Sequence, residues 1–548
     1  MKIFKLIILL LIVSVPLSVN VGVENENDSP LFVNNKIFIK TKYELKISEA
    51  TGKIEVATGF AELDVKNEKY KVNKIERIFN LFNGNKELYE KYEMSRMYTF
   101  HIEPSGNISD IVRDYDKDEI VEFAEPVFVG YGAGQRDLMY KKDYKSNNNS
   151  DIIKDKQLLV PDDEYFYKQW YLQNNGQIRT MDKVRPKKGA DINIVPAWDI
   201  EQGSEEVIIA ILDSGIREDI PDFMGRIWRN KKEIPNNKID DDLNGYVDDY
   251  NGWDFAYDDK YIDDGFGHGT NIATVIGAGL NNRIGFAGIN GKSKMMICKN
   301  LNDNNYGEYE WWAKSVKYAT DNGAHVINMS EGGADYSKIL ETACNYAKDN
   351  GTLVVSSMMN KNNGKDYYPA CFKSVLAVGA TDADDRRVKE FTWGGGSCWG
   401  KHNAVVAPGN KIYGYDYDDP DNYDSYWSGT SQSTAIVSAL ASLLLSQDKT
   451  RTPDDLRSII VATAVDQVGD PTEDVQGWDP YYGYGRVDFY RALTYSLPVQ
   501  TYQRERVEEK QYYEQETKEG AETIERKPGE KTEQQEKKSS RTAKPKPR

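Results

Sequence analysis

The chain has 548 residues, an apolar fraction of 39% and a formal net charge of −17 at pH 7. This length predicts more than one domain, and the apolar content is sufficient for a large core. The negative charge argues against a nucleic-acid partner, because a surface that binds phosphates carries the opposite sign.

Residues 1–23 predict a secretory signal peptide. Two lysines precede the apolar stretch Leu6–Leu17, and a basic start followed by a short apolar core is typical of export signals. The stretch is short for a membrane span, and an uncleaved anchor is the alternative. We therefore expect a secreted or extracellular protein without a stable membrane span once the signal is removed. The periplasm and the cell surface are the alternative destinations.

Residues 28–132 predict a small α+β unit. Strand-like patterns occur at Phe38–Lys40 and Tyr98–Ile102, an amphipathic helix covers Ile108–Tyr115, and an extended segment closes the unit at Val121–Pro126. Residues 133–160 predict a linker, because much of this stretch is polar and charged. Such exposed segments are preferred sites of proteolytic nicking, so we expect a maturation site there.

Residues 161–497 predict an α/β domain. The strand-like segments are Val207–Leu212, Val326–Met329, Thr352–Val355 and Val375–Val378, and helical patterns follow His268 and cover Glu310–Asn322, Tyr336–Asn350 and Ser433–Ser446. This alternation favours a mostly parallel sheet with helices on both faces. Residues 498–548 are highly charged with few apolar side chains, which predicts a disordered tail.

The four cysteines are Cys298, Cys344, Cys371 and Cys398. Their spacing matches no zinc pattern, and four cysteines allow three disulfide pairings. Export permits disulfides, so we expect one between Cys344 and Cys371, with free thiols as the alternative. Cys298 lies in an apolar run and is expected to be a small buried side chain.

Three short motifs combine an acid, a base and a nucleophile. Asp213 ends an apolar strand in Ile-Leu-Asp-Ser-Gly, His268 lies in Gly-His-Gly-Thr, and Ser431 closes Ser-Gly-Thr-Ser. A serine hydroxyl needs an imidazole to take its proton, and the imidazole needs a carboxylate to fix its tautomer. The order Asp, His, Ser with these flanks resembles the subtilisin-like serine proteases (subtilases, peptidase family S8).

This resemblance implies a three-layer α/β/α fold with a mostly parallel central sheet, preceded by a small α+β inhibitory propeptide. It implies a secreted serine endopeptidase that is made as a self-processing zymogen and acts on proteins or peptides, with its own propeptide as an intramolecular inhibitor. Asn360 matches the side chain that helps to hold the oxyanion. The sequence departs from the family pattern at Met359, Gln432 and Ala435, where glycine, methionine and proline are usual. A catalytically impaired binding protein with this fold is therefore the alternative.

The resemblance also implies where substrate binds. Ser330, Glu331 and Gly332 match the segment that pairs with an extended peptide through backbone hydrogen bonds. Met358 and Met359 fall in an expected wall of the primary specificity pocket, which they would narrow or reshape. Glu331 replaces an apolar residue, and one hypothesis is that it favours a basic side chain in the substrate.

Two segments predict structural calcium sites. In the first, oxygen ligands occur at alternate positions around a glycine, and the expected ligand residues are Asp240, Asp242, Asn244, Tyr246 and Asp249. This spacing is similar to the first half of a calcium loop, with an acidic turn as the alternative. In the second, the family's calcium loop implies the Asn282 side chain, the carbonyls of Leu280, Ile284 and Phe286, and the remote acids Asp163 and Asp222. A further acidic insert, Asp416–Asp424, is expected to be a solvated loop.

Overall fold

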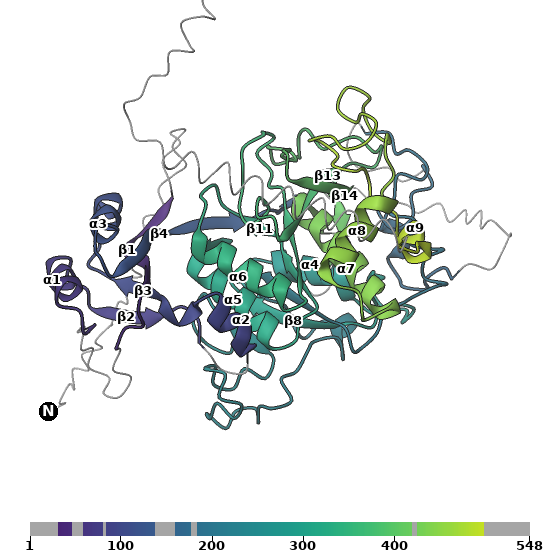
Figure 1. Cartoon of the computed structure of the whole chain (residues 1–548). Coiled ribbons are helices and arrows are strands. Elements are labelled where there is room, and N and C mark those ends of the chain that lie inside the picture. The colour runs from purple at the N-terminus through teal and green to yellow at the C-terminus, as the bar shows by residue number, and fades with distance from the viewer. Residues whose placement is uncertain are drawn as a thin grey trace, which may run out of the picture.

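The computed structural model describes residues 31–46, 58–80, 84–137, 159–176, 184–418 and 425–497. The expected signal peptide, the charged tail and most of the expected linker lie outside these residues. The described part forms an N-terminal unit (residues 31–132) packed against a larger unit that carries the three motifs (Figure 1).

The larger unit is built on a seven-stranded sheet with the order β14-β13-β12-β10-β6-β8-β7. Its strands are β6 (Ile208–Asp213), β7 (Gly252–Asp254), β8 (Lys294–Lys299), β10 (Val326–Met329), β12 (Leu353–Ser357), β13 (Val375–Thr381) and β14 (Asn403–Pro408). All neighbouring strands are parallel. The predicted parallel sheet is confirmed.

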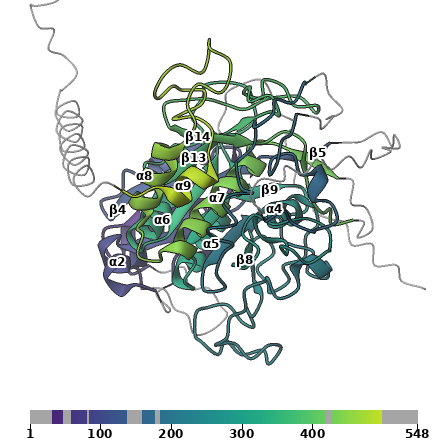
Figure 2. The ribbon, with the colours of Figure 1, turned by 90° about the vertical axis from the view of Figure 1, so that its right-hand side faces the viewer.

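Helices cover both faces of this sheet because its strands are apolar on both sides. One layer contains α4 (His268–Gly277), α7 (Thr430–Gln447), α8 (Pro453–Thr463) and α9 (Phe489–Thr494), and the other contains α5 (Tyr309–Asp321) and α6 (Lys338–Asp349). Figure 2 shows α7, α8 and α9 together on one side of the sheet. In β6, Ile209 and Ile211 belong to the core under α4 and α7, whereas Ala210 and Leu212 belong to the core under α5 and α6.

The N-terminal unit has a sheet and core of its own. Its elements are β1 (Phe32–Thr41), α1 (Ala61–Lys69), β2 (Lys74–Arg77), α2 (Lys86–Lys91), β3 (Met97–His101), α3 (Ile108–Tyr115) and β4 (Val121–Gly132). The strands pair antiparallel. Ile39, Phe100 and Tyr115 belong to one buried cluster beneath the helices. Helix α3 has the predicted bounds.

Strand β4 links the two units. It continues beyond its predicted end at Pro126 and pairs antiparallel with β9 (Tyr306–Glu308) and with β11 (Glu331–Gly332) of the larger unit. Figure 1 shows β4 running from the N-terminal unit towards β11. The next strand, β5 (Gln135–Asp137), pairs with β16 (Tyr426–Ser428), which pairs in turn with β15 (Ile412–Tyr413). The first residues of the expected linker therefore lie inside the larger unit.

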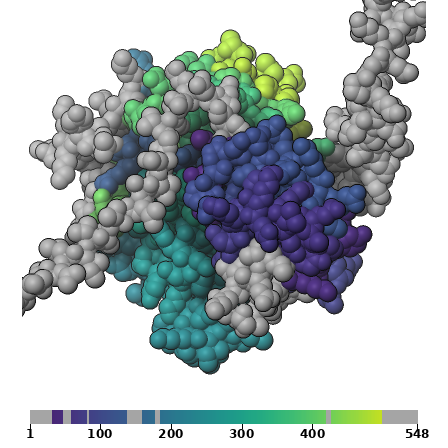
Figure 3. Space-filling model, turned by 90° about the vertical axis from the view of Figure 1, so that its left-hand side faces the viewer, coloured from purple at the N-terminus to yellow at the C-terminus, as the bar shows by residue number. Residues whose placement is uncertain are grey.

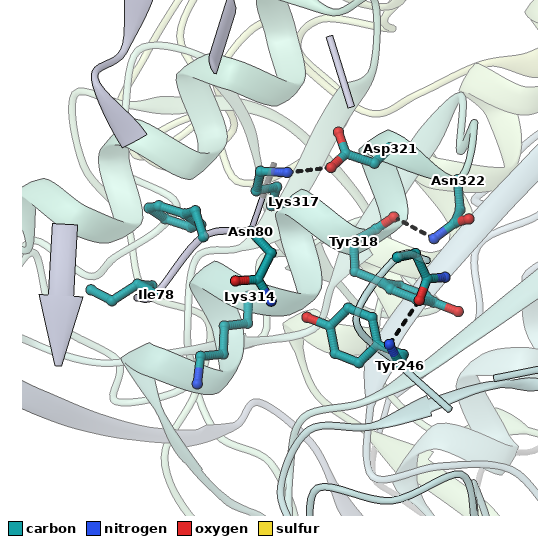
Figure 4. A pocket seen from close by; sticks show the side chains of 10 residues that line it. Ile78, Asn80, Tyr246, Lys314, Lys317, Tyr318, Asp321 and Asn322 are labelled. Atoms are coloured by element: carbon teal, nitrogen blue, oxygen red, sulfur yellow. Dashed lines mark hydrogen bonds and ion pairs between the residues drawn. The ribbon is translucent and has the colours of Figure 1, made fainter. Parts of the chain in front are cut away.

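The space-filling view shows the N-terminal unit directly against the larger unit (Figure 3), and further contacts join the two. The buried Glu125 carboxylate accepts hydrogen bonds from Ser337 Oγ at 2.6 Å and from the first backbone N–H groups of α6. Figure 4 shows a pocket at the seam, which is lined by Ile78 and Asn80 of the N-terminal unit together with Tyr246 and residues of α5. No residue of the three motifs lines this pocket.

The expected disulfide is wrong, because all four cysteines are free thiols. Cys344 lies within the buried core of α6, whereas Cys371 Sγ lies 3.3 Å from the ring nitrogens of His402. Among the described residues, no helix has the length and apolar character needed to cross a membrane.

Candidate active site

Asp213 and His268 meet at the carboxyl end of the parallel sheet. Asp213 is the last residue of β6 and His268 the first residue of α4, and both side chains are buried. Asp213 Oδ1 lies 2.7 Å from His268 Nδ1 and also accepts a 2.7 Å hydrogen bond from the Ser214 N–H. This contact orients the imidazole so that Nε2 is turned towards the cleft.

Asp264 fixes the start of α4, and our sequence analysis missed it. Its carboxylate accepts from the Gly267 N–H at 2.7 Å, from the Thr270 N–H at 2.9 Å and from Ser214 Oγ at 2.8 Å. An acidic residue just before a predicted helix is the signal that could have identified it. Because Ser214 is next to Asp213, Asp264 holds the strand end and the helix start in register.

Ser431 is the second residue of α7, which begins at Thr430 without the proline that is usual later in this turn. The Ser431 hydroxyl donates to the Ser330 carbonyl at 3.1 Å, and Ser330 Oγ donates to the Ser431 carbonyl at 3.0 Å. His268 Nε2 has no hydrogen-bond partner among the described residues. The hydroxyl must therefore rotate from Ser330 before it can give its proton to the imidazole.

Two donors converge on one carbonyl oxygen, that of Ala133. Asn360 Nδ2 donates to it at 2.5 Å and the Ser431 N–H at 3.3 Å. The side-chain oxygen of Asn360, Oδ1, accepts hydrogen bonds from the Thr430 N–H at 2.9 Å and from Thr430 Oγ1 at 3.0 Å. This bonding fixes the amide with its nitrogen towards Ala133 and creates the arrangement that stabilises an oxyanion.

Ala133 and Gly134 cross the site between the end of β4 and the start of β5. The Ala133 N–H donates to the Ser330 carbonyl at 2.7 Å. The next residue, Gly134, is so close to the imidazole that a Cβ added to it would lie 2.7 Å from His268 Nε2. The peptide bond between Ala133 and Gly134 therefore lies beside Ser431, His268 and Asn360 together.

Comparison with known proteins identifies the family. The subtilase family pattern matches residues 204–485, just over half of the chain. The chain belongs to the subtilase family. As a subtilase it is a serine endopeptidase and thus a hydrolase, and its subtilisin-like fold class is confirmed.

Two relatives and one solved structure are similar to this subtilase. Thermitase from Thermoactinomyces vulgaris is 32% identical over 299 residues, which cover 55% of this chain and 92% of thermitase. The cell wall-associated protease of Bacillus subtilis (strain 168) is 28% identical over 481 residues, covering 84% of this chain and 46% of that protein. The crystal structure of fervidolysin from Fervidobacterium pennivorans, a keratinolytic enzyme related to subtilisin, has a TM-score of 0.57 at 19% identity, covering 87% of this chain and 63% of that one.

The three predicted substrate-binding residues of the subtilase lie beside β4. Glu331 pairs with Gly132 and Gly332 with Tyr131, while Ser330 bonds Ala133. The Glu331 side chain is buried and accepts a 2.9 Å hydrogen bond from Asn300, and burial raises its pKa. The hypothesis that Glu331 attracts a basic substrate side chain is therefore not supported.

Met358 and Met359 form part of a buried cluster around Ala133. The other members of this cluster are Tyr367, Ala370, Ala377 and Cys398. Met359 has φ = 70°, in the left-handed region where a bulky residue is an outlier. The two methionines thus lie where the sequence predicted a wall of the primary pocket.

The first calcium segment brings together a different set of acids from the predicted one. Carboxylate oxygens of Asp242, Asp249 and Glu233 lie within 4.8 Å of one another, and Glu233 was not predicted. Asn244 Nδ2 donates a hydrogen bond to the Asp249 carboxylate at 2.8 Å. By contrast, the Asp240 carboxylate binds the backbone N–H groups of Asn244 and Gly245, so it shapes the loop.

In that segment the Tyr246 side chain packs against Trp253, Phe255 and Tyr318. These aromatic contacts fix this part of the loop. Three clustered carboxylates in a half-buried loop are a donor set that suits calcium.

The second calcium segment places Asp163 and Asp222 against the loop that contains Leu280, Asn282, Ile284 and Phe286. Asp163 accepts from the backbone of Asn281 and Asn282, and Asp222 from Asn282 Nδ2 at 2.7 Å and the Phe286 N–H at 3.0 Å. Both acids are buried, and burial raises the pKa of Asp222 to about 6. Paired acids that lose solvation in this way fit a divalent cation.

The acidic insert is not wholly solvated, contrary to our expectation. The Asp416 side chain is buried and pairs with Arg136 Nε at 2.8 Å, while Asp418 pairs with Arg136 Nη1 at 3.0 Å. Ser425 Oγ donates to Asp416 at 2.7 Å. Residues 419–424 of the insert lie outside the described residues.

Proposed function

We propose that this subtilase is made as a zymogen and hydrolyses its own chain between Ala133 and Gly134. A single observation carries the proposal: the Ala133 carbonyl oxygen lies within hydrogen-bond distance of both Asn360 Nδ2 and the Ser431 N–H. The propeptide would then end at Ala133, one residue beyond its predicted end at 132, and would remain bound through β4 as an intramolecular inhibitor after cleavage.

In the first step, Ser431 Oγ bonds to the Ala133 carbonyl carbon and its proton passes to His268 Nε2. Asp213 stabilises the imidazolium that results. Negative charge moves to the Ala133 oxygen, where the two donors already point. Since these donors need no rearrangement, they lower the barrier more than mobile water would.

In the second step, the bond from Ala133 to Gly134 breaks and His268 returns its proton to the Gly134 nitrogen. This leaves Ala133 as an ester on Ser431. Water, deprotonated by His268, then hydrolyses the ester and regenerates the free hydroxyl. The same steps would cleave protein and peptide substrates that enter between β9 and β11 once the propeptide leaves.

We propose structural calcium at both acidic segments. Asp242, Asp249 and Glu233 would hold one ion. Asp163 and Asp222, with the carbonyls of their loop, would hold the other. When bound, calcium would neutralise the clustered carboxylates and stabilise these loops by binding the folded state alone.

Secretion is part of the proposal as well. It is supported by the basic and apolar pattern of residues 1–23 and by the similarity to a protease named for the cell wall. The acidic surface argues against nucleic acid as a partner.

The test is the intact mass and the N-terminal sequence of purified wild type and Ser431→Ala, each with and without a fluorophosphonate probe, in calcium. We expect wild type to begin at Gly134 and to gain one probe adduct, and Ser431→Ala to remain uncleaved and unlabelled. If both proteins stay full length and unlabelled with the fold intact, the impaired binding protein replaces the protease as the better interpretation.

A further inference from the structure

Residues 130–137 occupy the cleft of this subtilase as a substrate would. The space around each of these residues therefore indicates which side chains the enzyme accepts at that position of a substrate. Around the Ala133–Gly134 bond the sequence reads Gly-Tyr-Gly-Ala, then Gly-Gln-Arg-Asp. Alternate positions 130, 132 and 134 are glycine. Gly130 and Gly132 lie at the end of β4, where alternate residues point to the same side, so that side of the strand end lacks side chains.

The site around Gly130 is closed to any side chain. A Cβ added to Gly130 would clash with Trp312 Cη2 and would lie 2.5 Å from the Gly332 carbonyl oxygen. Trp312 is fully buried and stacked on Tyr309, with ring centroids 4.8 Å apart. Neither a buried tryptophan nor a backbone carbonyl can move aside at low cost. Glycine is therefore required four residues before the cleaved bond.

The sites around Gly132 and Gly134 are less strict. A Cβ on Gly132 would clash with the Asn305 side chain, whose Nδ2 donates to the Gly132 carbonyl at 3.1 Å. A side chain can rotate away at the cost of that hydrogen bond. A Cβ on Gly134 would press on His268. A larger residue at either position should slow cleavage without abolishing it.

Met359 belongs to the buried surroundings of Ala133, the residue before the cleaved bond. Its side chain packs in the cluster around Ala133, and Ala133 itself is only 2% exposed. Its sulfur lies so close to the cleft floor that a Cβ on Gly332 would be 2.8 Å away. With φ = 70°, methionine here costs about 1 kcal/mol or more relative to glycine. A strained residue that fills a pocket points to a role in selecting small residues.

Beyond the cleaved bond, the cleft presents two acids. Arg136, the third residue after the bond, contacts both Asp416 and Asp418. The Asp416 carboxylate is buried, and without Arg136 it would keep Ser425 but lose the cation that compensates its charge. A basic side chain at this position should therefore be favoured in other substrates too.

We propose that this subtilase selects extended glycine-rich segments of the form Gly-Xaa-Gly-Ala-Gly-Xaa-Arg and cleaves them after the alanine. Trp312 imposes the first glycine, Met359 the small residue before the cleaved bond, and Asp416 with Asp418 the arginine. This inference rests on the proposed function, because it treats residues 130–137 as bound in the productive register.

The test uses the mature enzyme and quenched fluorescent peptides based on residues 129–137. The parent peptide is compared with peptides that carry phenylalanine in place of the alanine, alanine in place of the first glycine, or glutamate in place of the arginine. We expect kcat/KM to fall by about 30-fold or more for the phenylalanine peptide and for the alanine peptide. For the glutamate peptide we expect a loss of about tenfold.

The variant Met359→Gly tests the contribution of Met359 separately from that of the rest of the cleft. This variant should raise the ratio of kcat/KM for the phenylalanine peptide to that for the parent by about tenfold or more. Met359→Ala, which opens the pocket but keeps a side chain at positive φ, should raise the ratio as well and have a lower midpoint of unfolding than Met359→Gly. The control is Met224→Gly, since Met224 is 82% exposed and should leave the ratio unchanged.

Equal cleavage of the parent and phenylalanine peptides by wild type, or no change of the ratio in Met359→Gly, overturns the inference. Fluorophosphonate labelling and cleavage of unfolded casein are measured on the same preparation. If the enzyme is labelled and cleaves casein but shows no preference, only the selectivity is wrong. If it is neither labelled nor active, the proposed function fails and this inference fails with it.

Discussion

Hydrogen bonds to the side-chain oxygen of Asn360 fix the orientation of its amide, and with it the direction of the amide nitrogen. Thr430 supplies both donors to that carbonyl, and Thr430 is also the first residue of α7. The helix that carries the nucleophile thereby orients the oxyanion donor. Sequence similarity could place an asparagine in this region, but neighbouring Asn362 and Asn363 were competing choices until the contacts of each were known.

We expect Asn360→Ala to lower kcat by about 100- to 1,000-fold with little change in KM, because the lost hydrogen bond is strongest when the oxygen is negatively charged. Steady-state kinetics on the parent peptide check this. The matched control is Asn362→Ala, since the Asn362 side chain accepts from Arg387 at 2.9 Å. If Asn362→Ala lowers kcat more than Asn360→Ala does, the assignment of Asn360 as the oxyanion donor is wrong.

The four thiols differ in exposure and so in reactivity. Cys298, Cys344 and Cys398 are buried, while Cys371 is partly exposed. Burial and, to a lesser extent, the nearby Asp366 carboxylate raise the pKa of the Cys371 thiol to about 12. Because only the thiolate reacts, alkylation of Cys371 by iodoacetamide should accelerate about tenfold per pH unit from pH 7 to pH 10 without a plateau.

Mass spectrometry of peptides after timed alkylation measures this rate. Cys371→Ser should remove all labelling of the folded enzyme, and unfolding in urea should expose the other three thiols. A plateau near pH 9 would mean that the thiol is ordinary and that the neighbouring carboxylate has no effect.

At the scale of elements, the sequence pattern predicted the bounds of those helices and strands that depend on residues close together in the sequence. Helix α3 and strand β10 have their predicted bounds because periodicity and burial agree over those residues. The end of β4 was not predicted, since Gly130 and Gly132 have little intrinsic preference for a strand. They are extended because β9 and β11 pair with them from both sides, and such pairing comes from residues distant in sequence.

The acidic loops are the elements most dependent on a bound ion. Adding calcium at about 100 times its dissociation constant should raise the unfolding midpoint by about 5 °C, because only the folded state assembles the ligands. Asp222→Asn and Asp242→Asn should each reduce this increment. The control is Glu164→Gln, an exposed neighbour of the buried Asp163. Differential scanning calorimetry with and without EGTA measures the effect, and an equal increment in all variants would contradict it.

At the scale of the whole molecule, the sequence predicted two units but not their docking. The parallel sheet and the order of the three motifs follow from patterns within residues 161–497. The placement of Ala133 does not, because it depends on contacts of β4 with β9, β11 and Asn360 at once. The acidic insert was misjudged for the same reason, as Arg136 reaches Asp416 across 280 residues of sequence.

An ion-pair cluster lies at the seam between the N-terminal unit and the larger unit. Lys36 of β1 lies 2.9 Å from Glu308 and 3.1 Å from Glu310, and Glu310 is almost fully buried. Burial alone would lower the pKa of Lys36, but the charges of the two glutamates outweigh it and raise the pKa instead. The lysine is therefore charged at neutral pH.

We expect Lys36→Met in the Ser431→Ala precursor to weaken docking of the propeptide by about 3 kcal/mol, because it leaves buried carboxylates with a single remaining cation, Lys314. Urea unfolding of the precursor, followed by limited proteolysis at each concentration, measures when the N-terminal unit is released. The matched control is Lys71→Met, which breaks an ion pair with Glu103 that is more than half exposed on both sides and should cost less than about 1 kcal/mol. If both variants release the unit at the same urea concentration, the cluster at Lys36 contributes no more than a surface pair, and β4 in the cleft must hold the propeptide by itself.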